Sequence, residues 1–115
     1  MEPKFNIWIT TRRLTSLCQK SKHLCADTTY KLIYQGYPVL MVGTTDKKKS
    51  FHPFGIAICT NERNQDFEFI FKSIKTCAKQ FDNFYYEPDT LIADAADATT
   101  IGFKSAFGGN SLKKE

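Results

Sequence analysis

LIADAADA, from Leu91 to Ala98, is the segment around which this chain is organised, and HLCADTTY, from His23 to Tyr30, is its distant counterpart. Each is a short apolar run that leads to a carboxylate, Asp94 in the first and Asp27 in the second. If the two runs are parallel strands joined by a crossover through a helix, both acids lie near one edge of a sheet. Two carboxylates held in this way begin a magnesium site for phosphodiester chemistry. The sequence therefore predicts metal-binding acids at Asp27 and Asp94.

The composition is that of one folded domain. The chain has 115 residues, of which 42% are hydrophobic, and its ten Phe and five Tyr supply an aromatic-rich interior. Such a composition argues against disorder, and the length leaves no room for two cores. The net charge of +4 allows a polyanionic partner without requiring one.

The cysteines and the hydropathy pattern indicate a reducing compartment and no membrane. The four cysteines, Cys18, Cys25, Cys59 and Cys77, contain no paired C-x-x-C spacing of a zinc or redox site. Three of them, from Cys25 onward, fall in apolar patterns typical of small core residues. No signal peptide is recognisable, and no apolar run approaches the ~20 residues of a membrane span. We therefore expect reduced thiols in an intracellular protein.

Three regions are predicted along the chain. Residues 1–22 form an irregular lead-in and then a short helix, Arg12 to Lys20, which Thr10 or Thr11 caps. Residues 23–109 form the main α/β core. Residues 110–115 form a polar tail.

The first half of the core is predicted to be an antiparallel meander of three strands, His23–Tyr34, Pro38–Thr45 and Phe51–Thr60. The second strand is apolar on both faces at Val39–Val42, so it is expected to be central. Pro53 favours an edge position at the start of the third strand.

The second half of the core is predicted to be helix, strand and helix. Apolar residues recur with a 3.6-residue period from Gln65 to Phe81, and Asn64 is expected to cap this helix. Thr90–Ala93 is a short apolar strand of the kind found parallel to its neighbour. Ala95–Phe107 is the last predicted helix, ending at a Gly-Gly pair.

The candidate functional residues each have a structural alternative. Asp27 is an acid in mid-strand, where strand propensity disfavours it, yet it could be an ordinary exposed residue. Asp94 is placed equally well to cap the following helix. His52 is a candidate ligand or general base, or a structural residue beside Pro53. The basic residues around Arg12 are either a phosphate-contacting face or simply solvated.

The order of elements resembles the first part of a ribonuclease H-like fold, in which the fourth strand lies parallel to the first. Several runs, in this order and spacing, resemble the core of Mutator-like (MULE) transposases of the DDE class. They are ADTTYKL, GYPVLMVGTTD, FHPFGIAICTNER, DFEFIFKSI and LIADAADA followed by GFKSAFG. The resemblance covers roughly Thr10 to Gly108.

The resemblance implies a function and its residues. Asp27 and Asp94 would be the first and second catalytic acids, binding Mg²⁺ or Mn²⁺ for cleavage and transfer of DNA strands. Asp97 would lie in the first turn of the last helix, where its charge favours the helix dipole. The implied partner is transposon-end DNA, and the implied location is nuclear.

The departure from the family pattern concerns the third acid. In the family it follows a fifth strand and a Cys/His segment beyond the second acid, whereas this sequence ends at Glu115, to which no role is assigned. The sequence therefore predicts a truncated transposase core that lacks the fifth strand and is inactive alone. The alternative is a non-catalytic remnant that acts as a binding or protein-interaction module. An unpaired Thr90–Ala93 edge would then favour self-association.

Overall fold

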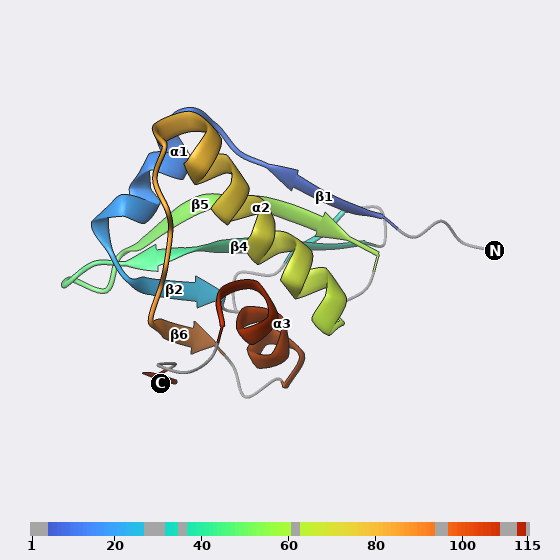
Figure 1. Cartoon of the computed structure of the whole chain (residues 1–115). Helices are drawn as coiled ribbons and strands as arrows, with labels where there is room; N and C mark the ends of the chain where they lie inside the picture. The colour runs from blue at the N-terminus through green and yellow to red at the C-terminus, as the bar shows by residue number, and fades with distance from the viewer. Residues whose placement is uncertain are drawn as a thin grey trace.

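The structure, a computed structural model, describes residues 5–26, 32–34, 37–60, 63–93, 97–108 and 113–114. These residues form a mixed sheet with helices packed on one face (Figure 1). The strands are β1 (Asn6–Ile9), β2 (His23–Ala26), β3 (Leu32–Tyr34), β4 (Tyr37–Thr45), β5 (Phe51–Cys59), β6 (Thr90–Ala93) and β7 (Lys113–Lys114). The helices are α1 (Arg12–Ser16), a 3₁₀ turn η1 (Leu17–Lys20), α2 (Asn64–Asp82) and α3 (Asp97–Phe107). The α/β class is therefore confirmed, and the arrangement is compatible with a ribonuclease H-like fold.

The order of strands across the sheet is β1-β5-β4-β2-β6-β7. The remaining strand, β3, also pairs with β4. β4 lies between β5 and β2, so the central position predicted from its apolar faces is confirmed. β2 and β6 are neighbours and parallel, in register from His23 with Thr90 to Ala26 with Ala93. The crossover that joins the meander to β6 contains α2, as the helical period predicted.

The amino-terminal lead-in was wrongly predicted to be irregular. Asn6–Ile9 is a strand that pairs antiparallel with the second half of β5, from Ile56 to Cys59. β5 is consequently not an edge strand over this half. Pro53 lies in the other half, where no described strand pairs with β5 on the side away from β4, so its edge preference is satisfied locally.

The last two element predictions differ in outcome, because one is tested only in part and the other is wrong. The long first strand, His23–Tyr34, is seen as β2 and β3, and residues 27–31 between them lie outside the described residues. The tail, predicted to form no element, contributes β7, which pairs parallel with Thr90 and Leu91 of β6. The β6 edge is thus covered over its first half by the chain's own backbone, which weakens the case for self-association there.

The helix starts differ slightly from the prediction. Thr11 caps α1, accepting a hydrogen bond from the Leu14 N–H at 3.1 Å, but the α-helical part ends at Ser16 and gives way to η1. Arg63 is the N-cap of α2, one residue before the predicted Asn64. The Asp66 carboxylate accepts from the Arg63 N–H at 2.9 Å, which satisfies a backbone donor at the helix start.

The core lies between the sheet and the pair α2 and α3. The face of α2 predicted from periodicity is buried at five positions, Phe67, Ile70, Phe71, Ile74 and Ala78. Phe71 packs edge-on against Phe103 of α3, with ring centroids 5.9 Å apart. Such packing fixes α3 against α2, and therefore fixes where α3 begins relative to the end of β6.

Candidate functional site

The predicted site lies where β2 and β6 end together. The described ladder closes with Ala26 opposite Ala93, and in the sequence the next residue of each strand is an aspartate, Asp27 and Asp94. Both aspartates lie outside the described residues. The structure therefore positions the strands that lead to the two carboxylates. The carboxylates themselves, as catalytic or metal-binding groups, stay a prediction.

The relative position of the two strands is fixed at their other ends. The Lys22 carbonyl oxygen accepts hydrogen bonds from the backbone N–H groups of Asp89 and Thr90, at 3.0 and 3.3 Å. The Thr90 hydroxyl donates to the Asp89 carboxylate at 2.8 Å. Leu24 and Leu91, opposite each other in the ladder, are fully buried. Because a parallel pair slips only if these contacts break, the register up to Ala26 and Ala93 is firmly set.

The helix after β6 frames the same end of the sheet. Figure 1 shows the arrowheads of β2 and β6 directed toward α3, which begins at Asp97. Residues 94–96, which connect β6 to this helix, lie outside the described residues. The alternative role of Asp94 as a helix cap is therefore untested. The first-turn position of Asp97, in contrast, is confirmed.

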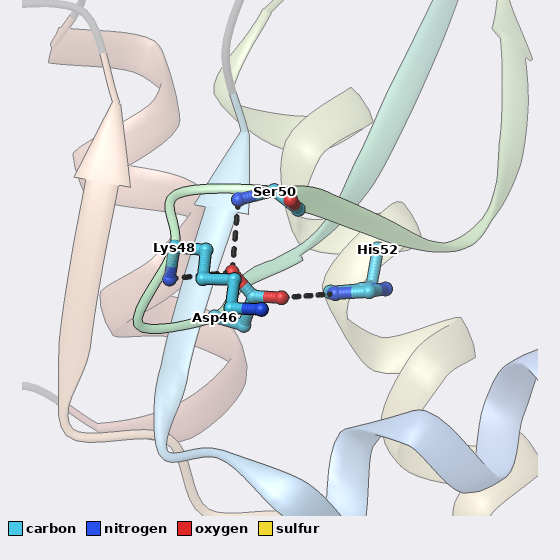
Figure 2. A network of polar contacts seen from close by, with 4 residues as sticks. All are labelled: Asp46, Lys48, Ser50 and His52. Atoms are coloured by element: carbon cyan, nitrogen blue, oxygen red, sulfur yellow. Dashed lines mark hydrogen bonds and ion pairs between the residues drawn. The ribbon is translucent and has the colours of Figure 1, made fainter.

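His52, the other candidate ligand, takes part in a separate network at the β4–β5 turn (Figure 2). Its Nε2 lies 3.0 Å from Asp46 Oδ2. The other carboxylate oxygen of Asp46 accepts from the backbone N–H groups of Lys48 and Ser50, at 2.8 and 2.9 Å. The hydrogen bond from His52 and then those from the backbone lower the pKa of Asp46. This geometry closes a turn, in which Lys49 has a φ of 63°.

The Asp46–His52 network lies beyond the start of β2, whereas the predicted acids follow the ends of β2 and β6 in the sequence. Gly43 pairs with Cys25 and Val42 with Ala26, so β4 runs from the end of β2 toward its start before reaching Asp46. In Figure 1 the β4–β5 turn accordingly lies beyond the start of β2, and the arrowheads of β2 and β6 point away from it. The structural interpretation of His52 is the one that this geometry favours.

The basic residues near the amino terminus are exposed, as both interpretations of them required. The Arg12 guanidinium lies 5.4 Å from the centre of the Phe81 ring, a cation–π contact. Lys20 and Lys22 line an open cavity of about 450 Å³ between η1 and the loop before β6. A phosphate-contacting role for these residues stays a prediction.

Tyr86 was missed by the sequence analysis, which treated residues 82–89 as a loop. Its side chain is 1% exposed and packs edge-on against Phe54 and Phe107, with ring centroids 5.8 and 5.6 Å away. Burial, and then the nearby Cys18, raise the pKa of its hydroxyl well above the ordinary value. Tyr86 holds the loop before β6 against the core. It lies in a short irregular segment next to two other aromatic residues, Phe84 and Tyr85, where no helical or strand period marks one of them as buried.

Two features are absent from the described part of the chain. No group of three or more His, Cys, Asp or Glu side chains is arranged to hold a metal ion there. No helix among those residues is long and apolar enough to cross a membrane.

Comparison with known proteins gives one match. The family model for the MULE transposase domain matches residues 23–112, well over half of the chain and including both β2 and β6. No curated protein and no solved structure matches the chain.

Proposed function

This chain belongs to the MULE transposase domain family, and we propose that it is a transposase-derived domain in which Asp27 and Asp94 form a divalent-metal site that acts on DNA. The observation that carries this proposal is the parallel register of β2 and β6, which ends with Ala26 opposite Ala93. Adjacent strands of a sheet lie about 4.8 Å apart, so we expect the residues that follow Ala26 and Ala93 to begin at about this separation. Carboxylates attached at these two positions can bind the same cation.

The donor chemistry fits Mg²⁺ or Mn²⁺. These ions prefer oxygen ligands, and Mg²⁺ commonly takes only one or two carboxylates, with water and phosphate oxygens completing its shell. When bound, such an ion activates a water or a 3′-hydroxyl and stabilises a leaving oxygen. Asp27 and Asp94 would hold and orient it, and the buried Leu24 and Leu91 behind them keep the strand ends rigid.

The same proposal gives the partner and the limits of the activity. The substrate is duplex DNA, the chain is nuclear, and its excess of basic residues, +4 in total, is compatible with a polyanion. Two-metal cleavage needs enough ligands for both ions. With two acids proposed, we expect one weakly held ion and no strand cleavage by these 115 residues.

Thermal unfolding with and without Mn²⁺ tests the metal site. An ion that binds only the folded chain raises its melting temperature by mass action. We expect a rise for the wild type that Asp27→Asn and Asp94→Asn each remove, while Asp97→Asn, the matched control three residues on, keeps it. A nicking assay on duplex DNA should be negative for every variant.

Two outcomes would contradict the proposal in different ways. A wild type without any Mn²⁺-dependent shift would show that the two acids do not form a metal site. Nicking by the wild type that Asp27→Asn abolishes would show that a third ligand is present and that the chain is an active nuclease. The non-catalytic binding module is the alternative function, and the observation in its favour is the exposure of three isoleucines on β1 and β5, Ile7, Ile9 and Ile56.

A further inference from the structure

A small cavity lies between the end of η1 and the turn that joins β4 to β5. Its volume is about 170 Å³. Lys20 and Ser21, at the end of η1, line one side of it, and Thr44, Asp46 and His52 line the other. We call it the η1 cavity. Its two sides come from segments that are distant in the sequence, so no local motif predicts it.

The side chain of Thr44 is buried beside this cavity. Thr44 follows the core residue Val42 by two positions on β4 and lies opposite His52 on β5. Residues two apart on a strand point to the same side of the sheet, so Thr44 is on the side that the helices cover. Thr44 is 5% exposed, and its Oγ1 has no hydrogen-bond partner among the described residues. Buried hydroxyls in folded proteins nearly always have a partner, and the η1 cavity is where an acceptor can reach this one.

Other donors line the η1 cavity beside Thr44. Lys20 is exposed there, and its ammonium group carries three N–H donors. The Ser21 hydroxyl accepts a hydrogen bond from the His23 N–H at 3.0 Å, which leaves its own proton available to an acceptor. Hydroxyl donors and a cation in one small cavity suit an anion that has several oxygen acceptors.

The carboxylate in the lining, that of Asp46, already makes hydrogen bonds within the turn. Figure 2 shows one of its oxygens bonded to the backbone N–H groups of Lys48 and Ser50, and the other bonded to His52. The three lysines of the turn, Lys47–Lys49, follow Asp46 directly and are exposed. The positive charge around the η1 cavity therefore outweighs that of its carboxylate.

We propose that the η1 cavity binds one phosphate group of a DNA backbone. Lysine ammonium groups and serine or threonine hydroxyls are common donors to phosphate oxygens in protein–DNA contacts, and Lys20, Ser21 and Thr44 supply them here. At about 170 Å³ the cavity is smaller than the ~300–1,000 Å³ of pockets for drug-sized ligands, so a single small group fits it.

The surroundings of the cavity favour a polyanion over a free anion. Lys47–Lys49 lie on one side of it, and on the other side Lys22 lines the larger cavity of about 450 Å³. Lys20 and Ser21 line both cavities, which are therefore contiguous at these two residues. A backbone with one phosphate in the η1 cavity has cations on either side of that phosphate, and salt weakens each such contact.

This contact is separate from the proposed metal site. It rests on the proposed function for the identity of the partner, duplex DNA. The η1 cavity lies next to the start of β2, whereas the ladder of β2 and β6 ends at Ala26, about 10 Å further along the strand. Binding of DNA here needs no divalent cation, so a measurement in EDTA tests it independently of Asp27 and Asp94.

Fluorescence anisotropy of a labelled duplex, titrated with the whole chain in EDTA, tests the hydroxyl. We expect Thr44→Val to bind about tenfold more weakly, because a hydrogen bond to a charged group is lost. Thr44→Ser keeps the hydroxyl and should bind like the wild type. Without DNA, Thr44→Val should unfold at the same or a higher denaturant concentration, since the hydroxyl that it removes has no partner among the described residues.

The salt dependence of the same titration tests the cation. Loss of one phosphate contact reduces the slope of log K against log salt by about 0.9. We expect this reduction for Lys20→Gln. Lys72→Gln, the matched control, removes the same charge from an exposed lysine of α2 and should leave the slope unchanged.

Four results would overturn the proposal. Wild-type affinity of Thr44→Val, or an equal loss of slope in Lys20→Gln and Lys72→Gln, would mean that DNA is held by general charge alone. Lower stability of Thr44→Val without DNA would mean that the hydroxyl has a structural bond. A shift of the Thr44 amide NMR signal with inorganic phosphate but not with duplex DNA would make the cavity a site for a free anion. Equal affinity for poly-L-glutamate, which carries carboxylates in place of phosphates, would point to an acidic protein as the partner.

Discussion

At the scale of single residues, burial changes the chemistry of the thiols. Cys18, the second residue of η1, is 1% exposed, and its burial, followed by the charge of Asp82, raises the pKa of its thiol from 9.0 to about 11. Burial also raises the pKa of Cys77. The sequence analysis predicted core positions for Cys25, Cys59 and Cys77, of which the first two are buried and Cys77 half-buried.

The raised pKa of the Cys18 thiol predicts that the folded protein loses stability at alkaline pH. The unfolded chain releases this proton near pH 9.0, whereas the folded chain keeps it up to about 11. The buried Cys18 thiol contributes its full stabilisation of the folded state below pH 9. This stabilisation is lost as the pH rises from 9 to 11, because over this range the thiol ionises in the unfolded state but not in the folded state. Chemical denaturation should therefore show that Cys18→Ala costs less at pH 11 than at pH 7. An unchanged difference between the two proteins would mean that the Cys18 thiol is not protected from ionisation.

At the scale of elements, those with a strong periodic pattern were predicted well. α2 lies within a residue of its predicted bounds, and β4 and β6 match closely, because apolar period and length distinguish them. β1 was missed because it is four residues long and its partner, β5, lies about fifty residues further along the chain. β7 was missed because Lys113 and Lys114 pair through their backbones, which leaves no side-chain signal.

The contact between α2 and α3 depends on a glycine. A Cβ added to Gly102 would lie 2.7 Å from Phe67 Cβ, 2.9 Å from the Glu68 nitrogen and 3.0 Å from the Asn64 oxygen. Two of these atoms belong to the α2 backbone and cannot move as a side-chain end can. Gly102 is thus a point of close approach between α3 and the first turns of α2.

Substitution of this glycine should destabilise the fold. In an exposed helix Gly→Ala is favourable by about 1 kcal/mol, but overpacking commonly costs about 1–3 kcal/mol. We expect Gly102→Ala to lower the free energy of unfolding, measured in denaturant. Ser105→Ala, at an exposed position of the same helix, should be neutral or slightly stabilising. Equal stability of the two variants would mean that the helices are further apart than described.

At the scale of the whole molecule, the sheet brings together segments that are distant in the sequence. The parallel pairing of β2 with β6 was predicted from two short apolar runs, each leading to an acid, and it is confirmed through Ala26 and Ala93. The geometry of Asp27 and Asp94 did not follow from this pattern, because the direction of a side chain beyond a strand end depends on the connection after it. The pairing of β1 with β5 was not predicted either, since Asn6–Ile9 was not recognised as a strand.

The central claim is that one divalent cation lies between Asp27 and Asp94, beyond the paired ends of β2 and β6. The most direct test is titration of ¹⁵N-labelled protein with Mn²⁺, whose unpaired electrons broaden the amide signals of nearby residues. We predict that the signals of Ala26 and Ala93 broaden first, that those of Lys48 and Ser50, in the β4–β5 turn beyond the start of β2, persist at the same Mn²⁺ concentration, and that Asp27→Asn abolishes the effect. Early broadening around Asp46 instead, or uniform broadening across the protein, would contradict the claim.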